Sequence, residues 1–221
     1  MKLVLYGGGA GEDNHELDAA AIKLAGKAYP QMTYIPSASF GGEIDFKDFV
    51  GNFASFEMTK FIYFPVDMPF DKTLADEAFK SDIIHLGGGN TYYFLYYLRK
   101  HKLISRLRNF VKEGGVLTGL SAGAILMTPV IETAGFPSFD CDKNEENITN
   151  LRGLNLVKFE FFPHYRSSHR YDKELIRYSK RCNVPLFACS DGAGLVVEGD
   201  CFKSIGKTVL FSKGQKIPFS F

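Results

Sequence analysis

Short hydrophobic runs alternate with longer amphipathic segments over the first half of the chain. A short continuous hydrophobic run that ends near glycine or proline is typical of a strand buried on both faces, whereas hydrophobic positions three and four apart indicate a helix. Strands are expected at residues 3–6, 33–35, 61–64, 83–86 and 116–118. Helices are expected at residues 16–26, 46–56, 72–80, 92–98 and 103–112. This alternation predicts an α/β fold with a mostly parallel sheet that is covered by helices on both faces.

The pattern changes in the second half of the chain. A polar loop is expected at 140–150, followed by a strand at 156–162 and a helix at 172–180. Short hydrophobic runs then predict strands at 186–188, 195–198, 202–205 and 208–211, with glycine turns between the last of them. We therefore expect a short antiparallel finish at the C-terminal end. No repeat or linker divides the chain, so residues 1–221 are expected to form a single domain.

The composition narrows the class of protein. The chain has 26 basic and 25 acidic residues and a formal net charge of +1, so neither a nucleic-acid surface nor a basic membrane patch is expected. No hydrophobic stretch approaches the ~20 residues that cross a bilayer. The four cysteines lack the spacing of a metal or redox motif. We therefore expect a cytoplasmic protein with no metal and no cofactor.

The strongest chemical signal lies at residues 114–124, Gly-Gly-Val-Leu-Thr-Gly-Leu-Ser-Ala-Gly-Ala. A hydrophobic strand precedes Gly-x-Ser-x-Gly, and small residues that can begin a helix follow it, which is the context of a nucleophile elbow. We expect Ser121 to be the nucleophile, and the Ala122 amide, at the helix N-terminus, to donate to a developing oxyanion. The alternative is a strand-to-helix turn with no catalytic role.

A second glycine-rich turn, Gly-Gly-Gly-Asn-Thr at 87–91, follows the expected strand at 83–86. Ligands gather at the carboxyl edge of open α/β sheets, so the amide of Gly88 or Gly89 is a candidate second oxyanion donor. The alternative is a tight turn that requires positive φ. The first glycine run, at 7–11, departs from GxGxxG because Glu12 stands where glycine is required, so no dinucleotide site is expected.

A serine nucleophile requires a base, and histidine is the usual one. His164 follows the hydrophobic run at 156–162, and a parallel strand ending there would bring it to the same sheet edge as Ser121. His169 is the rival. The residues alone do not choose the carboxylate that orients the base. The candidates between serine and histidine are Glu132, Asp140, Asp142, Glu145 and Glu146.

Four segments together resemble the peptidase E and cyanophycinase group of serine hydrolases. They are Leu-Tyr-Gly-Gly-Gly at 5–9, the glycine turn at 87–91, Gly-Leu-Ser-Ala-Gly-Ala at 119–124 with Pro129 behind it, and Leu-Asn-Leu at 154–156 leading to Pro-His-Tyr at 163–165. Residues 191–199 also look like the closing strand of that group. The resemblance covers nearly the whole chain. It implies a flavodoxin-like three-layer sandwich akin to class I glutamine amidotransferases, with Ser121 as nucleophile and His164 as base.

The resemblance also implies the rest of the site. In peptidase E-like proteins the third triad residue is expected in the loop between serine and histidine, where Asp140 matches best and Asp142 is the reserve. The loop that ends at Asn90 would form part of the oxyanion hole and substrate pocket. Peptidase E cleaves dipeptides that begin with aspartate, and Arg166 or Arg170 is expected to pair with that carboxylate. The alternative is that both arginines are surface residues.

The predicted function is therefore serine-type hydrolysis of short peptides, and specifically of dipeptides with N-terminal aspartate, through an acyl-enzyme. Two alternatives stay open: a cyanophycinase-like or isoaspartyl hydrolase, and a non-catalytic binding or regulatory protein with the same fold. The expected partner is a small peptide substrate. The sequence does not predict an oligomeric state.

Overall fold

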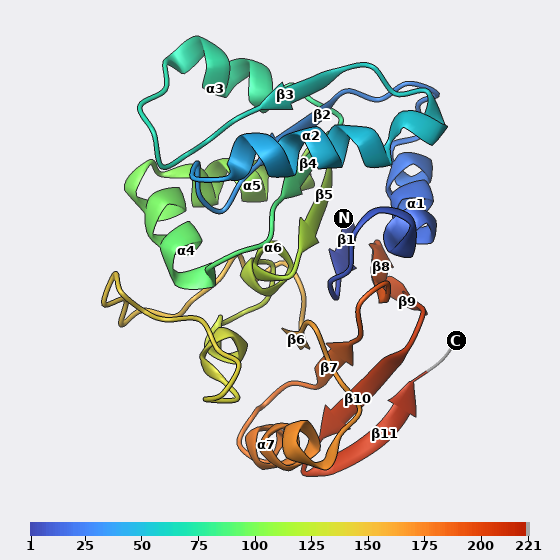
Figure 1. Cartoon of the computed structure of the whole chain (residues 1–221), viewed down its shortest axis with the longest axis vertical. Helices are drawn as coiled ribbons and strands as arrows, with labels where there is room; N and C mark the ends of the chain where they lie inside the picture. The colour runs from blue at the N-terminus through green and yellow to red at the C-terminus, as the bar shows by residue number, and fades with distance from the viewer. Residues whose placement is uncertain (220–221) are drawn as a thin grey trace.

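The computed structural model describes residues 1–219, and within that range the strands form two sheets (Figure 1). The larger sheet has the strand order β3-β2-β4-β5-β1-β8-β9. Its parallel strands are β1 (Lys2–Tyr6), β2 (Met32–Ile35), β3 (Phe61–Tyr63), β4 (Ile83–Leu86) and β5 (Val116–Leu120). Two antiparallel strands, β8 (Gly194–Glu198) and β9 (Cys201–Ile205), complete it. The strands predicted in the first half of the chain are thus confirmed, and they lie in one sheet.

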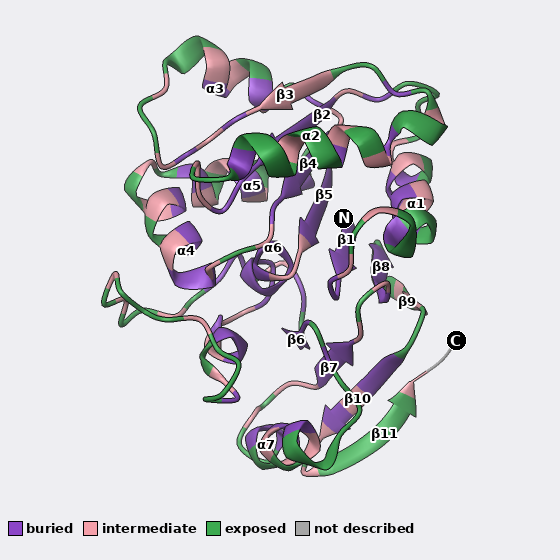
Figure 2. Cartoon of the chain, viewed as in Figure 1, coloured by how far each residue is buried: buried purple, intermediate pink, exposed green. Residues whose placement is uncertain are grey.

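Helices cover both faces of the larger sheet. Along β1, Leu3 and Leu5 pack into a core on one face, whereas Val4 and Tyr6 pack into a core on the other. Because both faces are buried (Figure 2), these strands consist almost entirely of hydrophobic residues. The second face is covered by α1 (His15–Ala25) and α2 (Gly42–Asn52). The first is covered by α3 (Lys72–Ala78), α4 (Thr91–Lys100), α5 (Leu103–Lys112) and α6 (Ala122–Leu126).

Local sequence signals set several helix ends. The Asn90 side chain accepts a hydrogen bond from the Tyr93 amide (3.0 Å) and caps the start of α4. Gly26, in the left-handed region at φ 68°, ends α1. Short 3₁₀ turns lie at Gly11–Asn14, Ala54–Phe56 and Glu132–Gly135. No helix within residues 1–219 is long and hydrophobic enough to cross a membrane.

The smaller sheet was not predicted as a separate unit. It has the order β11-β10-β7-β6 and contains β6 (Glu160–Phe162), β7 (Leu186–Cys189), β10 (Thr208–Ser212) and β11 (Gln215–Phe219). Helix α7 (His169–Ser179) packs on one of its faces, and the opposite face adds Phe161 and Phe187 to the main core. The strand expected before His164 therefore pairs with β7 in this sheet and does not end at the edge of the larger one.

Candidate active site

Ser121 lies on a sharp turn between β5 and α6. Its backbone angles, φ 51° and ψ −106°, fall outside the regions that residues with a side chain ordinarily adopt. The neighbouring glycines make room for this turn. A Cβ on Gly119 would lie 2.5 Å from the Gly123 carbonyl carbon, and one on Gly123 would lie 2.2 Å from the Leu86 carbonyl oxygen. The turn thus has the geometry of a nucleophile elbow, with Ala122 at the first position of α6.

The His164 side chain connects Ser121 to a carboxylate. Its Nε2 is 2.8 Å from Ser121 Oγ, and its Nδ1 is 2.7 Å from Asp191 Oδ1. An imidazole with one nitrogen on a hydroxyl and the other on a carboxylate can take the hydroxyl proton while the carboxylate fixes its tautomer. The side chains of His164 and Asp191 are 48% and 51% exposed, so the group is open to solvent.

The first glycine run, at residues 7–11, packs directly against His164 and Asp191. Gly8 has φ 138°, and a Cβ on it would lie 2.0 Å from Asp191 Oδ1 and 2.3 Å from His164 Nδ1. The His164 amide donates to the Gly7 carbonyl (2.6 Å), and the Gly192 amide donates to the Gly8 carbonyl (3.1 Å). Gly7 and Gly8, which belong to the run that does not match the dinucleotide pattern, therefore allow the end of β1 to pack directly against His164 and against Gly192, the residue after Asp191.

Asp140 does not lie beside His164, which corrects the sequence-based choice of the orienting carboxylate. The Asp140 carboxylate accepts a hydrogen bond from the Tyr171 hydroxyl. Asp142, the reserve, accepts one from the Thr91 amide at 2.7 Å. The position at Nδ1 belongs to Asp191, which follows β7 and lies beyond His164 in the chain. The sequence-based candidates all lay between the serine and the histidine. In the structure β7 pairs with β6, so Asp191, after β7, lies beside His164, after β6.

One signal for Asp191 was present in the sequence. Asp191 follows a buried hydrophobic strand, as Ser121 does, and Gly192 comes directly after it. Polar residues at the carboxyl ends of strands are where α/β folds build their sites. His169, the rival base, is the first residue of α7 and is exposed.

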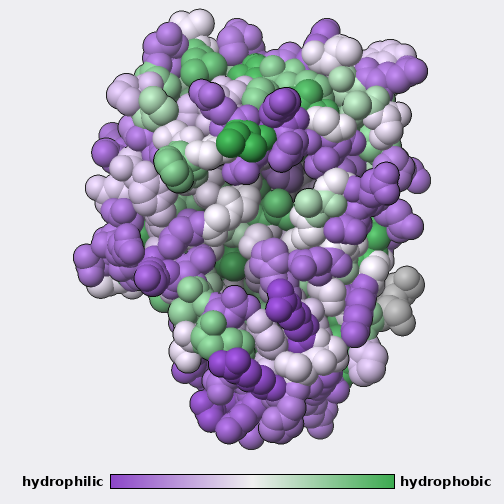
Figure 3. All heavy atoms as spheres, viewed as in Figure 1, coloured by the Kyte–Doolittle hydropathy of each residue, from purple (hydrophilic) through white to green (hydrophobic). Residues whose placement is uncertain are grey.

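Ser121 and His164 line a cavity of about 800 Å³. Among the residues predicted to bind substrate, Gly89 and Arg166 also line it. The aromatic side chains of Phe136 and Phe139 form part of its wall. The face drawn in Figure 3 is hollowed near its middle, with hydrophobic residues inside and a largely hydrophilic rim. The cavity is large enough to hold a short peptide.

The other predicted binding residues have different contacts. The Asn90 side chain donates from Nδ2 to the Lys143 carbonyl (2.8 Å) in addition to capping α4, so it holds the 140–150 loop against that helix. The Arg170 guanidinium lies over the Phe139 ring, with its Cζ 3.3 Å from the ring centroid. Gly88 lies against Leu120, the residue before the elbow serine.

Tyr171, which donates to the cavity-lining Asp140, has a shifted pKa. Burial, and then the hydrogen bond to Asp140, raise the pKa of Tyr171, whereas Arg166 and Arg170 act in the opposite direction. Tyr171 is therefore a protonated donor to Asp140 at neutral pH. Within residues 1–219 no group of three or more His, Cys, Asp or Glu side chains is arranged to hold a metal ion.

The model of Peptidase family S51 matches residues 3–205. The chain belongs to this family. A relative named uncharacterized peptidase Lin0382, from Listeria innocua serovar 6a, is 32% identical over 138 residues, which are 62% of this chain and 65% of that protein. YgaJ of Bacillus subtilis (strain 168), also named an uncharacterized peptidase, is 27% identical over 204 residues, covering 88% and 83%. A protein named peptidase E from Nostoc sp. is 31% identical over 113 residues, 44% of each chain. The match to the Listeria relative thus spans just under two thirds of its length.

Solved structures show the same fold for this S51 family member. A Listeria monocytogenes EGD-e protein, provisionally named a peptidase E, superposes with a TM-score of 0.74 at 22% identity, over 92% of this chain and 97% of that one. A peptidase from an acI-B1 Actinobacterium has a TM-score of 0.71 at 16% identity, over 99% and 93%. The predicted flavodoxin-like three-layer sandwich with a mostly parallel sheet is confirmed.

Proposed function

We propose that this S51 family member is a serine peptidase in which Ser121 is the nucleophile, His164 the general base and Asp191 the orienting carboxylate. The observation that carries the proposal is the continuous hydrogen-bonded series Ser121 Oγ–His164 Nε2 (2.8 Å) and His164 Nδ1–Asp191 Oδ1 (2.7 Å). The strained elbow at Ser121 supports it, because such strain is maintained where it positions a reacting group.

In the proposed mechanism, His164 takes the proton of Ser121 as Oγ attacks the carbonyl carbon of the substrate amide. The imidazolium then gives this proton to the leaving amine as the C–N bond breaks, which leaves an acyl-enzyme. Water, deprotonated by His164, then attacks the ester, and the imidazolium returns the proton to Ser121 Oγ as the C–O bond breaks and the acid leaves. Asp191 holds the Nδ1 proton and stabilises the imidazolium at both stages.

The oxyanion is proposed to accept hydrogen bonds from the Ala122 amide and from the amide of Gly88 or Gly89. Ala122 follows the nucleophile directly, and the Gly88 backbone lies against Leu120, so both segments border the elbow. Gly89 lines the Ser121 cavity. Each such donor contributes roughly 3 kcal/mol to transition-state stabilisation.

The proposed substrates are short peptides, and specifically dipeptides with N-terminal aspartate. Arg166 lines the same cavity as Ser121 and is the proposed partner of the aspartyl carboxylate, since a guanidinium can bind a carboxylate with two hydrogen bonds. Arg170 instead packs on Phe139, and we propose that it supports the cavity wall. The name peptidase E carried by the Nostoc relative supports this substrate class.

Hydrolysis of aspartyl p-nitroanilide by the wild-type protein and the Ser121→Ala variant tests the proposal. We expect turnover by the wild type and none by Ser121→Ala, with unchanged thermal unfolding. Ser138→Ala is the matched control, because Ser138 is an exposed serine that lines the same cavity, and it should keep full turnover. Equal turnover by wild type and Ser121→Ala would refute the serine mechanism.

Two further measurements identify the substrate class if the p-nitroanilide is not cleaved. A panel of α- and β-aspartyl dipeptides distinguishes peptidase E-like from isoaspartyl hydrolysis. Labelling by a fluorophosphonate reports on the nucleophile without any substrate. Labelling of wild type but not of Ser121→Ala would support the triad, and a folded wild-type protein that resists labelling would indicate a non-catalytic member of the fold.

A further inference from the structure

The Asp191 carboxylate is held in place by little besides His164. Its side chain is 51% exposed, and within residues 1–219 its one hydrogen bond is the 2.7 Å contact with His164 Nδ1. Solvent competes with an exposed contact of this kind, and exposed charged pairs contribute little by themselves. The alignment of the two side chains therefore depends on how firmly the loop after β6, which carries His164, is fixed to the loop after β7, which carries Asp191.

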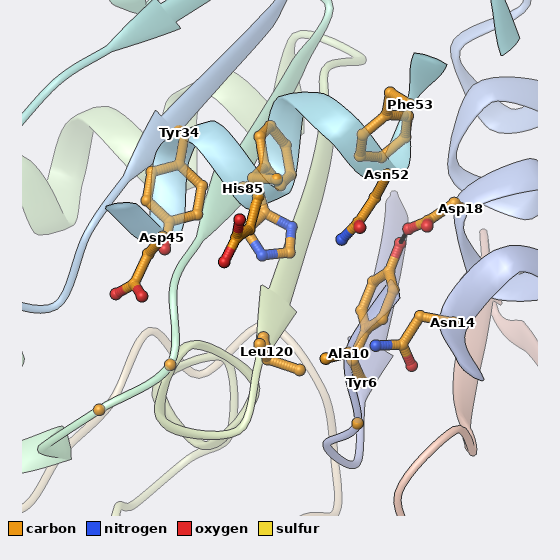
Figure 4. Close-up of a pocket in the computed structure, with 15 residues that line it drawn as sticks. Tyr6, Ala10, Asn14, Asp18, Tyr34, Asp45, Asn52, Phe53, His85 and Leu120 are labelled. Carbon is orange, nitrogen blue, oxygen red and sulfur yellow. Dashed lines mark hydrogen bonds between the residues drawn. The ribbon is translucent and has the colours of Figure 1, made fainter. Parts of the chain in front are cut away.

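Backbone hydrogen bonds join both loops to the glycine turn at residues 7–9. The His164 and Gly192 amides donate to carbonyls of this turn. Figure 4 shows the turn between Tyr6 and Ala10, and these two residues line a cavity of about 370 Å³. A turn that borders a cavity has fewer packing contacts to hold it than one buried in the core. The two loops therefore need a further link that does not pass through this turn.

One side chain joins the two loops directly. Ser190 precedes Asp191, and its Oγ donates to the carbonyl of Tyr165, the residue after His164, at 2.9 Å. The Tyr165 amide donates to the Cys189 carbonyl, also at 2.9 Å. Both backbone polar groups of Tyr165 are thus bound by the two residues that precede Asp191.

Both ends of the Ser190–Tyr165 hydrogen bond are anchored. The Ser190 amide donates to the Lys207 carbonyl (3.2 Å), and the Ser190 carbonyl accepts from the Ala193 amide (3.0 Å). The Tyr165 side chain is 1% exposed, and its hydroxyl donates to Asp172 of α7. Because neither end can move freely, the hydrogen bond fixes the position of one loop relative to the other.

The backbone of His164 requires such support. Its φ is 52°, in the left-handed region that residues with a side chain rarely adopt. A conformation of this kind persists only where the surrounding structure fixes it. Without the Ser190 hydroxyl, the carbonyl of Tyr165 would lose this partner, and the strained backbone beside it would be free to relax and to carry the imidazole away from Asp191.

We propose that Ser190 is a positioning residue, whose hydroxyl fixes the His164 loop against the Asp191 loop and so keeps the carboxylate aligned with His164 Nδ1. The inference rests on the proposed function, because it concerns the same Ser121–His164–Asp191 series. Ser190 is not among the residues that line the Ser121 cavity. Its loss should therefore lower kcat and leave substrate binding unchanged.

The test compares kcat and KM of the wild type and Ser190→Ala on one substrate that the wild type cleaves. We expect kcat to fall at least tenfold, with KM within twofold of wild type. Ser179→Ala is the matched control, since Ser179 is a buried serine of α7 whose Oγ also donates to a backbone carbonyl, that of Ile176 (3.0 Å). It should lower the melting temperature and keep wild-type kcat. Unchanged kcat in Ser190→Ala, or an equal loss of kcat in both variants, would overturn the proposal.

A double-mutant cycle shows whether Ser190 acts through Asp191. In the Asp191→Ala background the contact with His164 is already absent, so Ser190→Ala should lower kcat less than twofold further. The same tenfold factor in both backgrounds would overturn the positioning role.

A second variant keeps the test decisive if Ser190→Ala does not fold. Ser190→Cys has a side chain of similar shape but a weak donor, and it should lower kcat several-fold at unchanged KM. Wild-type kcat in a folded Ser190→Cys variant would contradict the inference. Absence of turnover by the wild type on every substrate would refute the proposed function and this inference together, whereas an active wild type with equally active Ser190 variants would refute this inference alone.

Discussion

Gly8→Ala is expected to inactivate the protein although it replaces no residue of the proposed triad. A Cβ at position 8 would lie 2.0 Å from Asp191 Oδ1 and 2.3 Å from His164 Nδ1, whereas ordinary van der Waals contact begins near 3.4 Å. The Asp191 carboxylate would have to withdraw by more than 1 Å, and the 2.7 Å contact with His164 would be lost. The new methyl group would therefore separate His164, the proposed base, from Asp191, the proposed orienting carboxylate.

The magnitude follows from what that contact does. Replacing the orienting aspartate of a Ser-His-Asp triad lowers kcat by about 10⁴, which corresponds to roughly 5.5 kcal/mol of activation free energy. We expect Gly8→Ala to lower kcat by about 10³- to 10⁴-fold. Its φ of 138° is also unfavourable for alanine, and backbone strain of this kind costs about 1–3 kcal/mol of unfolding free energy.

The assay compares kcat for the cleaved p-nitroanilide or dipeptide with thermal unfolding of the same preparations. Gly26→Ala is the matched control: Gly26 also has positive φ (68°), but a Cβ there would meet nothing within 4 Å. It should lose about 1 kcal/mol of stability and keep wild-type kcat. A folded Gly8→Ala variant with kcat within threefold of wild type would show that the glycine does not support the catalytic contact.

Three further predictions concern stability and specificity. Burial raises the pKa of Glu160 from 4.5 to about 7, so between these pH values the folded state keeps a proton that the unfolded chain releases. The free energy of unfolding should therefore fall by about 3 kcal/mol as pH rises from about 4.5 to 7. Glu160→Gln should remove that loss. Melting temperatures at pH 5 and pH 8 test this, and a Glu160→Gln advantage that does not grow with pH would contradict it. Gly123→Ala should prevent folding or lower the melting temperature strongly, because its Cβ would lie 2.2 Å from the Leu86 carbonyl oxygen. A melting curve like that of wild type would contradict the close packing of the elbow against β4. Arg166→Met should raise KM for aspartyl substrates at least tenfold with little effect on uncharged dipeptides, whereas an equal KM increase for both would show that Arg166 does not read the carboxylate.

The sequence was sufficient for the central strands of the larger sheet, β1, β2, β4 and β5, because they are buried on both faces. Residues 83–86, for example, are entirely buried and form β4 as predicted. The elbow was also predictable, because the strand, the two glycines and the serine that form it are contiguous in the sequence. The smaller sheet was not predictable in this way, because β6 and β7 are joined through α7 and their pairing is not encoded in either segment alone.

The site residues show the same contrast between local motifs, which were predictable, and long-range contacts, which were not. Ser121 and His164 were predicted from motifs, and the structure brings them to hydrogen-bonding distance. Asp191 was missed because its role depends on β7 lying beside β6, a long-range contact. The role of Gly8 could not be predicted for a similar reason, because the atoms that exclude a side chain at this position belong to His164 and Asp191, which are distant in the sequence.

The measurement that tests the central claim most directly compares kcat/KM of Asp191→Asn and Asp140→Asn with wild type on one substrate. Asp191 contacts His164 Nδ1, whereas Asp140 contacts Tyr171. The triad proposed here predicts a loss of about 10³- to 10⁴-fold for Asp191→Asn and less than tenfold for Asp140→Asn. The opposite order, with Asp140→Asn inactive and Asp191→Asn near wild type, would contradict it.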